Sequence, residues 1–582
     1  MASEENSSRA RIKITPELFS ITHLQYYIET RYAFLQDLPP EQTGELMNDL
    51  PLERPESDKE LHQDQRREIK HRRAYLATAA MEMVYGNYRQ ALDALEYAEN
   101  GYRKYFPREH ISRLEISSFR ALLLALNSKP IEAEGLCKRT FAILGEERGY
   151  KHPLTLVTMS ILVQIQLKMW HFFPAMDTAT TLVRRTTKTL GENDILTLHS
   201  RAQLAAAKFH HGDYYGAETD LESVIPILEG HLLSEHPDMF QYQCLLAKVY
   251  LKRGKFEAAE KRLVPVLEMK PREYSKDSRR NEAAQTDVDT GFPEYGLTDF
   301  LNTFVKDPKA AFSGTKPHPQ FLSALAVYAD ILFQQQSPAG FAISIHRATW
   351  LQQKIELGNS HLDTVATLYR LAVLTRETKE DYESYIEVRE QLEEVTKARN
   401  DIFGGSHAST LCALREDLVL GYNIRALVSP GPWVDNAETD PIYFQGKDVF
   451  AESHYIYECH KSRLGRFHPE TIQSLYWLFK LRVSKSFHEQ TCALANELLD
   501  CLKVVRDDCP VFSLSLECSV AFLFYEFGYY RTAKQISVRT TEAIDHYLTM
   551  GDREMRWFLE RLRSENLGFI DHLCGKLGEE RG

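Results

Sequence analysis

Histidine is the residue whose number and placement in this chain most invite a chemical interpretation. The 582 residues include 21 histidines and nine cysteines. Cys459, His460 and His468 offer a thiol and two imidazoles, which are ligands that zinc accepts, but no fourth ligand stands at a zinc spacing. We therefore expect Cys459 to be a thiol packed on a helix face and predict no metal site. Cys501 and Cys509, eight residues apart, receive the same interpretation.

Sequence signatures of catalysis are absent from the chain. It contains no Walker loop, no Gly-x-Ser-x-Gly elbow, no His-Glu-x-x-His motif and no dinucleotide fingerprint. The adjacent acids Asp507 and Asp508 are interpreted as a solvated helix end. We therefore predict that the chain is not an enzyme and that it uses no cofactor.

Composition narrows the class of protein further. The chain is 43% hydrophobic and 26% charged, which is ordinary for a globular protein, and its net charge of -12 argues against nucleic-acid binding. No apolar stretch approaches the roughly 18 residues that a membrane span needs. The first residues lack the apolar core of a secretory signal, and the cysteines form no Cys-x-x-Cys pair. These features predict a cytoplasmic or nuclear protein with reduced thiols.

Several histidines instead mark a 42-residue period. His110, His152, Asp194 and His236 are each 42 residues apart. A small residue follows each of them after eleven residues and alanine follows after twenty-three, as in Ala247 and Ala259 for the position at 236. A period between 20 and 50 residues predicts a stack of supersecondary units whose product is an extended surface.

Residues that end one helix and begin the next recur in each period. A Leu-Gly pair or close variant precedes each new unit, and we expect its glycine to cap a helix while the register histidine helps to close that turn. The proline of His-Pro then starts the next helix. Leu-Gly variants occur at Leu144-Gly145, Leu190-Gly191, Leu357-Gly358, Phe403-Gly404 and Leu464-Gly465, and His-Pro occurs at 152–153, 236–237, 318–319 and 468–469.

A second glycine stands eighteen residues after the register position and is followed two residues later by an aromatic. We expect this glycine to break the first helix and the ring to pack under the turn. The pairs are Gly86 with Tyr88, Gly212 with Tyr214, Gly254 with Phe256, and Gly528 with Tyr530.

These features resemble the tetratricopeptide repeat. Ala247, Gly254, Phe256 and Ala259 show that family's order of a small residue, a glycine, an aromatic and an alanine at spacings of 7, 2 and 3. The 42-residue period with Leu-Gly-x-x-His-Pro resembles the kinesin-light-chain subclass. The resemblance implies an all-α, right-handed α-solenoid of helix-turn-helix repeats, in which the first helix of each repeat lines a concave face.

We count ten repeats, numbered one to ten, over about 420 residues. They start near residues 68, 110, 152, 194, 236, 318, 361, 407, 468 and 510. The pattern is weaker in repeats eight and nine, where Leu418 and Phe479 replace the small residue. The predicted organisation is a tail, capping helix (16–38) and linker (39–66) in 1–67, a first array at 68–270, an insertion at 271–317, a second array at 318–551 with an insertion near 427–447, and a C-terminal capping helix in 552–582.

The candidate binding residues come from the offsets that face inward in such repeats. Offsets eight, twelve and fifteen lie on one stripe of a helix, and five and sixteen flank it. The predicted groove residues are Gln164, Lys168, His199, His210, Gln241, Lys248, Lys252, Arg376, Arg415 and Asn423. Three lysines on the inner wall of an acidic protein favour an acidic ligand. The alternative is that long helices carry lysines on any wetted face.

The sequence thus predicts a non-catalytic scaffold or adaptor that binds a protein or peptide partner, through an acidic or aromatic segment, in its concave groove. Two alternatives stay open: a regulatory or accessory subunit of an enzyme or signalling complex, and a self-associating array autoinhibited by the 271–317 insertion. The insertions total about 70 residues, too few to bury a catalytic core of their own. No sustained heptad precedes residue 68, so we do not expect a motor light chain.

Overall fold

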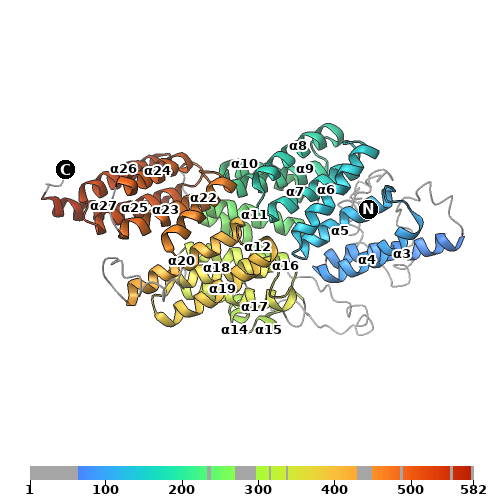
Figure 1. Ribbon diagram of the computed structural model, residues 1–582, viewed down its shortest axis with the longest axis horizontal. Helices are drawn as coiled ribbons and strands as arrows, with labels where there is room; N and C mark the ends of the chain where they lie inside the picture. The colour runs from blue at the N-terminus through green and yellow to red at the C-terminus, as the bar shows by residue number, and fades with distance from the viewer. Residues whose placement is uncertain are drawn as a thin grey trace, which may run out of the picture. The chain divides into compact units, whose positions relative to one another are not determined.

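The fold is built from helices throughout the part of the chain that the structure describes. The computed structural model describes residues 63–84, 86–231, 237–268, 297–312, 316–335, 338–428, 448–485, 489–550 and 555–578. These residues form 23 helices and no strand (Figure 1). The all-α class of helix-turn-helix repeats predicted from the sequence is confirmed.

The helices up to residue 268 are α3 (Gln63–Val84), α4 (Tyr88–Tyr105), α5 (Ile111–Leu126), α6 (Pro130–Glu147), α7 (Pro153–Lys168), α8 (Phe172–Leu190), α9 (Ile195–His211), α10 (Tyr214–Glu229), α11 (Pro237–Arg253) and α12 (Phe256–Glu268). The later helices are α14 (Leu297–Lys306), α15 (Pro308–Ala311), α16 (Pro319–Gln334), α17 (Ala339–Glu356), α18 (Leu362–Thr378), α19 (Tyr382–Phe403), α20 (Ala408–Val428), α22 (Val449–Leu464), α23 (Pro469–Lys485), α24 (Glu489–Val505), α25 (Pro510–Glu526), α26 (Tyr530–Thr549) and α27 (Arg556–Leu577). None of the described helices is both long enough and apolar enough to cross a membrane.

Some predicted segments fall outside the described residues. They are the capping helix at 16–38, most of the linker at 39–66, and 271–296 and 429–447 of the two insertions. Residues 63–66 of the predicted linker belong to α3, and the predicted C-terminal helix is α27. Residues 297–312 of the first insertion form α14 and α15, which contact α17. The Phe300 ring packs with Phe304 and with Phe321 of α16.

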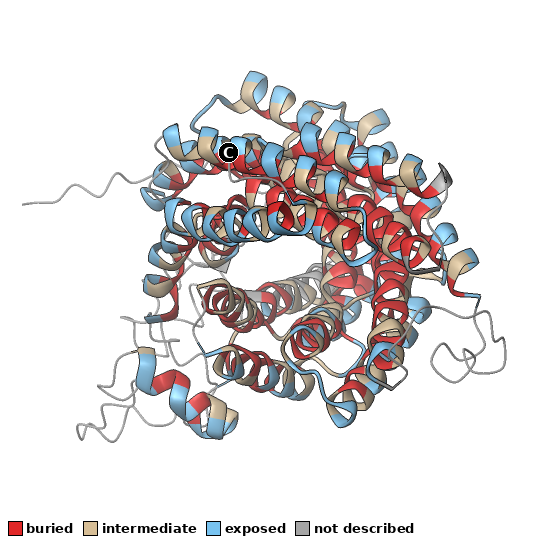
Figure 2. Cartoon of the chain, turned by 90° about the vertical axis from the view of Figure 1, so that its left-hand side faces the viewer, coloured by how far each residue is buried: buried red, intermediate tan, exposed pale blue. Residues whose placement is uncertain are grey.

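The small residues at offsets eleven and twenty-three lie where helices meet. The alanines at offset eleven that include Ala121 and Ala205 are fully buried, as are those at offset twenty-three that include Ala217 and Ala259. A methyl side chain lets two helix backbones approach closely. Figure 2 shows the result: helices carry buried residues on the faces turned toward neighbouring helices and exposed residues on their outer faces.

The glycine turns at offset eighteen are confirmed. Gly86, Gly212, Gly254 and Gly528 all have positive φ, between 74° and 103°. Glycine adopts this left-handed conformation without a Cβ clash. Two repeats reach the same conformation without glycine, because Ser128 has φ 60° and Trp170 has φ 56° at the same register position. Neither residue type marks a left-handed turn, so these two turns could not be predicted from the repeat pattern.

The Leu-Gly caps are confirmed with one correction. Gly191, Gly358, Gly404 and Gly465 have φ between 90° and 95°, as the caps require. Gly145 was predicted to cap its helix, but it lies inside α6, and Gly149 takes the left-handed conformation at φ 83° instead. The helix therefore runs about one turn further than its Leu-Gly pair indicated.

The register histidines do more than close the preceding turn. The backbone N–H of His361 does so by donating to the Gly358 carbonyl at 3.3 Å, but its ring Nδ1 accepts from the Asp363 N–H at 3.2 Å. His110 and His318 accept in the same way. A side chain that accepts from the first free N–H groups is an N-cap. The sequence prediction that the imidazole serves the preceding turn was therefore incomplete, because the ring caps the helix that follows.

The chain divides into two compact units. The smaller unit holds residues up to 127, 132–162 and 184–196. One cluster of its core contains Leu114, Leu144 and Leu154, and a hydrogen bond of 2.7 Å joins the buried hydroxyls of Ser118 and Thr158. Polar groups buried together in this way satisfy each other and help to fix the register of α5 against α7.

The larger unit holds residues 128–131, 163–183 and 197–582. Its helices pack in chain order from α16 to α20 and from α22 to α27, as a solenoid requires. One of its clusters surrounds Phe479 and Leu498 and also includes Tyr214, the first residue of α10. Phe479, which weakened the repeat pattern in the sequence, is fully buried there.

Candidate functional site

The predicted groove residues of repeats three and four include a buried polar group. His199 of α9 is only 7% exposed. Its ring forms hydrogen bonds with Gln164 at 3.3 Å, with Gln203 at 2.8 Å and with the Tyr242 hydroxyl. Burial lowers the pKa of His199. The ring is therefore neutral and connects α7, α9 and α11, rather than standing free toward a ligand.

The predicted lysines lie close enough to one another to share electrostatic partners. Lys248 is exposed on α11, and Lys168 is half-buried at the end of α7. Burial raises the pKa of Asp363, but the charges of Lys168, His361 and Lys248 outweigh it and bring that pKa below its usual value. The structure thus places two of the three lysines near one carboxylate of α18.

The other predicted groove residues of this region are His210, Lys252 and Gln241, and two of them lie near His468. Burial, with help from Lys248 and His468, lowers the pKa of His210 to about 3. Lys252 is exposed on α11 and contributes to lowering the pKa of His468. Gln241, also on α11, is exposed. Lys248 and Lys252 therefore stand beside imidazoles whose pKa values are lowered.

Arg376 and Arg415 belong to a buried ion-pair network. Arg415 donates to Glu470 at 2.8 Å and to Glu416 at 2.9 Å, and Arg376 pairs with the second carboxylate oxygen of Glu416 at 2.9 Å. Burial raises the pKa of Glu470, but Arg415 and two histidines outweigh it and hold that pKa well below its usual range. Asn423, on the same helix as Arg415, hydrogen-bonds with Tyr385. Within this network Arg415 is 5% exposed.

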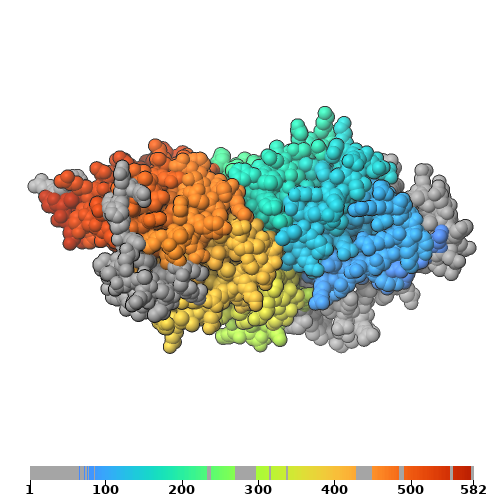
Figure 3. Space-filling view, in the orientation of Figure 1, coloured from blue at the N-terminus to red at the C-terminus, as the bar shows by residue number. Residues whose placement is uncertain are grey.

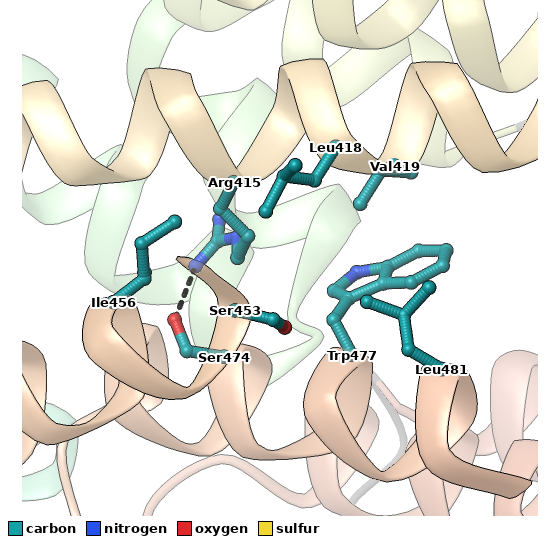
Figure 4. A pocket seen from close by; sticks show the side chains of 8 residues that line it. All are labelled: Arg415, Leu418, Val419, Ser453, Ile456, Ser474, Trp477 and Leu481. Carbon is teal, nitrogen blue, oxygen red and sulfur yellow. Dashed lines mark hydrogen bonds between the residues drawn. The ribbon is translucent and has the colours of Figure 1, made fainter. Parts of the chain in front are cut away.

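Figure 4 shows the surroundings of Arg415. Its guanidinium lies beside Ser474 at the edge of a cavity of about 10 Å³, which α20, α22 and α23 enclose. The other lining residues are mainly apolar and include Leu418, Ile456 and Trp477. A space of this size holds one water molecule at most. The network therefore connects helices and leaves no room for a substrate.

One cluster in the same region contains a thiol, an imidazole and a carboxylate. Cys412 Sγ lies 3.3 Å from Glu470 and 3.8 Å from His460 Nε2. Burial raises the pKa of Cys412 well above its usual value, so the thiol stays protonated. His460 hydrogen-bonds instead with the Ala408 carbonyl and the Ser474 hydroxyl, and burial, with Arg415, lowers its pKa to about 4. This arrangement does not activate a nucleophile.

Metal binding has no candidate among the described residues. No group of three or more histidine, cysteine, aspartate or glutamate side chains there could hold an ion. His460 and His468 are both buried and hydrogen-bonded to backbone carbonyls, His460 to Ala408 and His468 to His210.

An open groove lies over α23, α25 and α27, and it is the site that the sequence analysis did not name. We call it the aromatic groove. It has a volume of about 390 Å³. Its lining residues are Tyr476, Lys480, Cys518, Ser519, Phe522, Leu523, Glu526, Leu562, Glu565, Asn566 and Phe569.

The aromatic groove combines exposed rings with charges of both signs. Phe522 is 49% exposed, and its ring lies 5.9 Å from that of Phe569. The Lys480 ammonium lies 4.7 Å from the Trp477 ring and 4.9 Å from the Tyr422 ring, within cation–π distance. Burial lowers the pKa of Lys480, and Glu526 opposes that shift. The groove therefore combines an apolar surface with an ammonium and two carboxylates, of which Glu526 acts on Lys480 and Glu565 pairs with Arg561 at 2.8 Å.

The sequence did contain the signal for this groove. Tyr476 and Lys480 stand at offsets eight and twelve of repeat nine. Cys518, Phe522 and Glu526 stand at offsets eight, twelve and sixteen of repeat ten. The inward-facing offsets had been applied only as far as repeat eight, so these residues were missed although the same rule identifies them.

Comparisons with known proteins support the repeat assignment. Residues 197–238 match the family model of the tetratricopeptide repeat. No curated protein matches the chain. Two solved structures of nearly identical tetratricopeptide-like repeats from a putative kinesin light chain of Podosopora anserina are similar to parts of it. One has 26% identity over 34% of this chain and 92% of that chain, with a TM-score of 0.28; the other has 23% identity over 38% and 98%, with a TM-score of 0.27.

The TM-scores of these two structures are too low to support an argument about the arrangement of the whole chain. The family match at 197–238 covers one full 42-residue period, from offset three of repeat four into repeat five. It confirms that the chain contains tetratricopeptide repeats. Such repeats indicate a scaffold for protein–protein interaction.

Proposed function

We propose that this tetratricopeptide-repeat chain is a non-catalytic adaptor that binds an extended segment of a partner protein in the aromatic groove. The observation that carries the proposal is the side chain of Phe522. This large ring is half-exposed, and it lines an open groove of about 390 Å³ together with the partly buried Lys480. Exposed aromatic surface in a concave site, together with a few polar or charged groups, is typical of a binding site.

The chemistry of the groove favours a segment with an aromatic or aliphatic anchor between two opposite charges. The anchor packs against Phe522 and Phe569. A carboxylate on one side reaches Lys480, whose partly buried ammonium forms stronger hydrogen bonds than a fully hydrated one. A basic group elsewhere on the segment reaches Glu526, since Glu565 already pairs with Arg561. Each charge-assisted hydrogen bond contributes about 1.5–3 kcal/mol when it is partly desolvated.

The lysines of the first array remain a second proposed contact for an acidic segment. Lys168, Lys248 and Lys252 come from repeats three and five. The two lysines on α11 are exposed, and the neighbouring His210 and His468 have lowered pKa values and are neutral at physiological pH. A carboxylate approaching Lys252 therefore meets an exposed ammonium, whereas one approaching Lys248 also meets Asp363, whose pKa Lys168 and Lys248 lower.

The test is a selection of random peptides displayed on phage against the full-length chain, followed by binding measurements with the selected peptides. Phe522→Asp and Lys480→Glu should each weaken binding at least about tenfold, which corresponds to about 1.4 kcal/mol. Tyr382→Asp is the matched control, because Tyr382 is 53% exposed on α19 and does not line the groove. Unchanged affinity for both groove variants would contradict the proposed site.

The same peptides distinguish binding at the lysines of the first array from binding at the aromatic groove. The triple variant Lys168→Glu, Lys248→Glu and Lys252→Glu should abolish binding of peptides that contact the lysine wall, and it should not affect peptides specific for the groove. Peptides that bind every variant equally would assign binding to the convex face or to the insertions.

A further inference from the structure

Repeats that are five apart in the sequence touch one another in the larger compact unit. The turn of repeat two contacts the start of repeat seven, where Ser128 Oγ accepts from the Leu362 N–H at 2.9 Å. The turn of repeat three contacts the start of repeat eight, where His407 Nε2 donates to the Met169 carbonyl at 3.0 Å. Both contacts join residues of the same compact unit.

The next two repeats continue the series without a change of offset. His468 Nε2, at the start of repeat nine, donates to the His210 carbonyl in the turn of repeat four at 2.9 Å. Arg253, in the turn of repeat five, donates to the Asp507 carbonyl just before repeat ten at 3.3 Å. We call these four contacts the turn ladder and each contact a rung. In Figure 3 the orange surface of α22 and α23 adjoins the green surface of α10.

In each of the four contacts, the size of the side chain at offset eighteen matches the space that the opposite repeat leaves for it. An added Cβ at Gly212 would lie 3.3 Å from Pro469, and one at Gly254 would overlap Val511. Trp170 instead fills its rung, packing with Phe172, Ala408 and Leu464. The two left-handed residues that are not glycine, Ser128 and Trp170, are thus the two whose side chains reach the opposite repeat. Strained backbone persists where surrounding contacts hold it.

The two middle rungs depend on neutral imidazoles. His407 Nδ1 accepts from the Ser409 N–H at 3.3 Å, and His468 Nδ1 accepts from the Glu470 N–H at 3.2 Å. The same rings donate through Nε2 to the opposite turns. Only the neutral tautomer with its proton on Nε2 does both. His407 Nδ1 also lies 2.9 Å from the Ser409 hydroxyl, which donates to it in this tautomer. A second proton on Nδ1 would point at a backbone N–H in His468, and in His407 it would require the Ser409 hydroxyl to turn and accept; in both rings it removes the N-cap.

Charged and titratable groups surround both rings. Arg399, Arg463 and His171 act on His407, and burial is the main reason that its pKa falls to about 4. Burial also lowers the pKa of His468, although Glu470 opposes this; His210 reaches the ring through its carbonyl and across the stacked Phe172 ring, and His211 and Lys252 act on it as well. The outer rungs use a serine hydroxyl and an arginine, which do not titrate near neutral pH.

We propose that the turn ladder is a clasp that opens when protons bind His407 and His468, so that repeats three and four separate from repeats eight and nine as the pH falls. The folded imidazoles hold protons less readily than free ones, so the ladder is fully stable above about pH 6.5 and loses stability as the pH falls toward 4. α23, which begins at the third rung, also carries Tyr476 and Lys480 of the aromatic groove. The clasp does not depend on the proposed function of that groove.

The test is hydrogen–deuterium exchange of the full-length chain at pH 7.5 and pH 5.0, corrected for the intrinsic exchange rate. A histidine with pKa about 4 when closed and about 6.5 when open shifts the opening equilibrium about 30-fold between these pH values. Backbone amides at the turn around Trp170, which His407 contacts, should lose protection by about that factor, and those at the turn around Gly212, which His468 contacts, should lose protection in the same direction. The turn around Gly528 is the internal reference, since an added Cβ there meets nothing within 4 Å. An equal change at all three turns would overturn the proposal, and this comparison needs no variant.

A double variant tests whether His407 and His468 are the residues that bind these protons. His407→Gln with His468→Gln keeps a donor and an acceptor on each side chain but does not titrate in this range, so the pH response at the two turns should disappear. His454→Gln is the control, because His454 is exposed on α22 away from the ladder, and it should keep the wild-type response. A pH response that persists in the double variant would overturn the assignment to these two residues.

Discussion

The turns at Gly254 and Gly528 have the same sequence pattern and the same backbone, but different neighbours. Each glycine follows a small residue and precedes an aromatic residue and an alanine, and the spacings of these residues are the same in both repeats. The φ angles of the two glycines are 81° and 83°. An added Cβ at Gly254 would overlap Val511 and contact Met555, whereas one at Gly528 meets nothing within 4 Å. The repeat sequence therefore determines the conformation of the turn, and a repeat five units away determines what covers it.

The largest expected effect separates these two glycines. Gly254→Val should lower the free energy of unfolding by about 4 kcal/mol, because strain at positive φ and overlap with Val511 each cost about 1–3 kcal/mol. Gly528→Val should cost only the strain, about 2 kcal/mol. Urea denaturation followed by circular dichroism measures both. Equal losses would show that the covered turn gains nothing from its distant neighbour.

A smaller effect is expected at Trp170, where a side chain replaces the glycine. Trp170→Ala should lower stability by about 2–3 kcal/mol, since it empties part of the cluster with Ala408 and Leu464. Trp170→Gly removes the same contacts but relieves the strain at φ 56°, so it should be about 1 kcal/mol more stable than the alanine variant. The same denaturation experiment orders the two variants, and a glycine variant less stable than the alanine variant would mean that Trp170 is not strained.

The regular features of this fold were predictable because they repeat. A 42-residue period, a glycine at offset eighteen and a buried alanine at offset twenty-three are local requirements of helix pairs, and each recurs often enough to be recognised in one sequence. The groove residues Tyr476 and Phe522 were predictable for the same reason. The prediction that Gly145 caps its helix was wrong because α6 continues past the Leu-Gly pair, and Gly149 takes the left-handed conformation instead.

The contacts between distant repeats were not predictable from the period. Ser128 and Trp170 carry no turn signal of their own, because their left-handed backbone is supported by repeats seven and eight. Arg415 stood at an inward-facing offset, yet its place in a buried network depends on Glu470 of the following repeat. Such pairings depend on how far the solenoid turns per repeat, which a single sequence does not encode in any one residue.

The most direct test of the turn ladder is a cross-link between residues 254 and 511. A full-length Gly254→Cys, Val511→Cys variant should form a disulfide on mild oxidation, because the Cβ of the first residue would touch the side chain of the second. The Gly528→Cys, Val511→Cys variant retains the same nine native cysteines and is the control. A shift on a non-reducing gel, reversed by dithiothreitol, measures the bond. We predict rapid, nearly complete cross-linking of the first pair only; cross-linking no faster than in the control would contradict contact between repeats five apart.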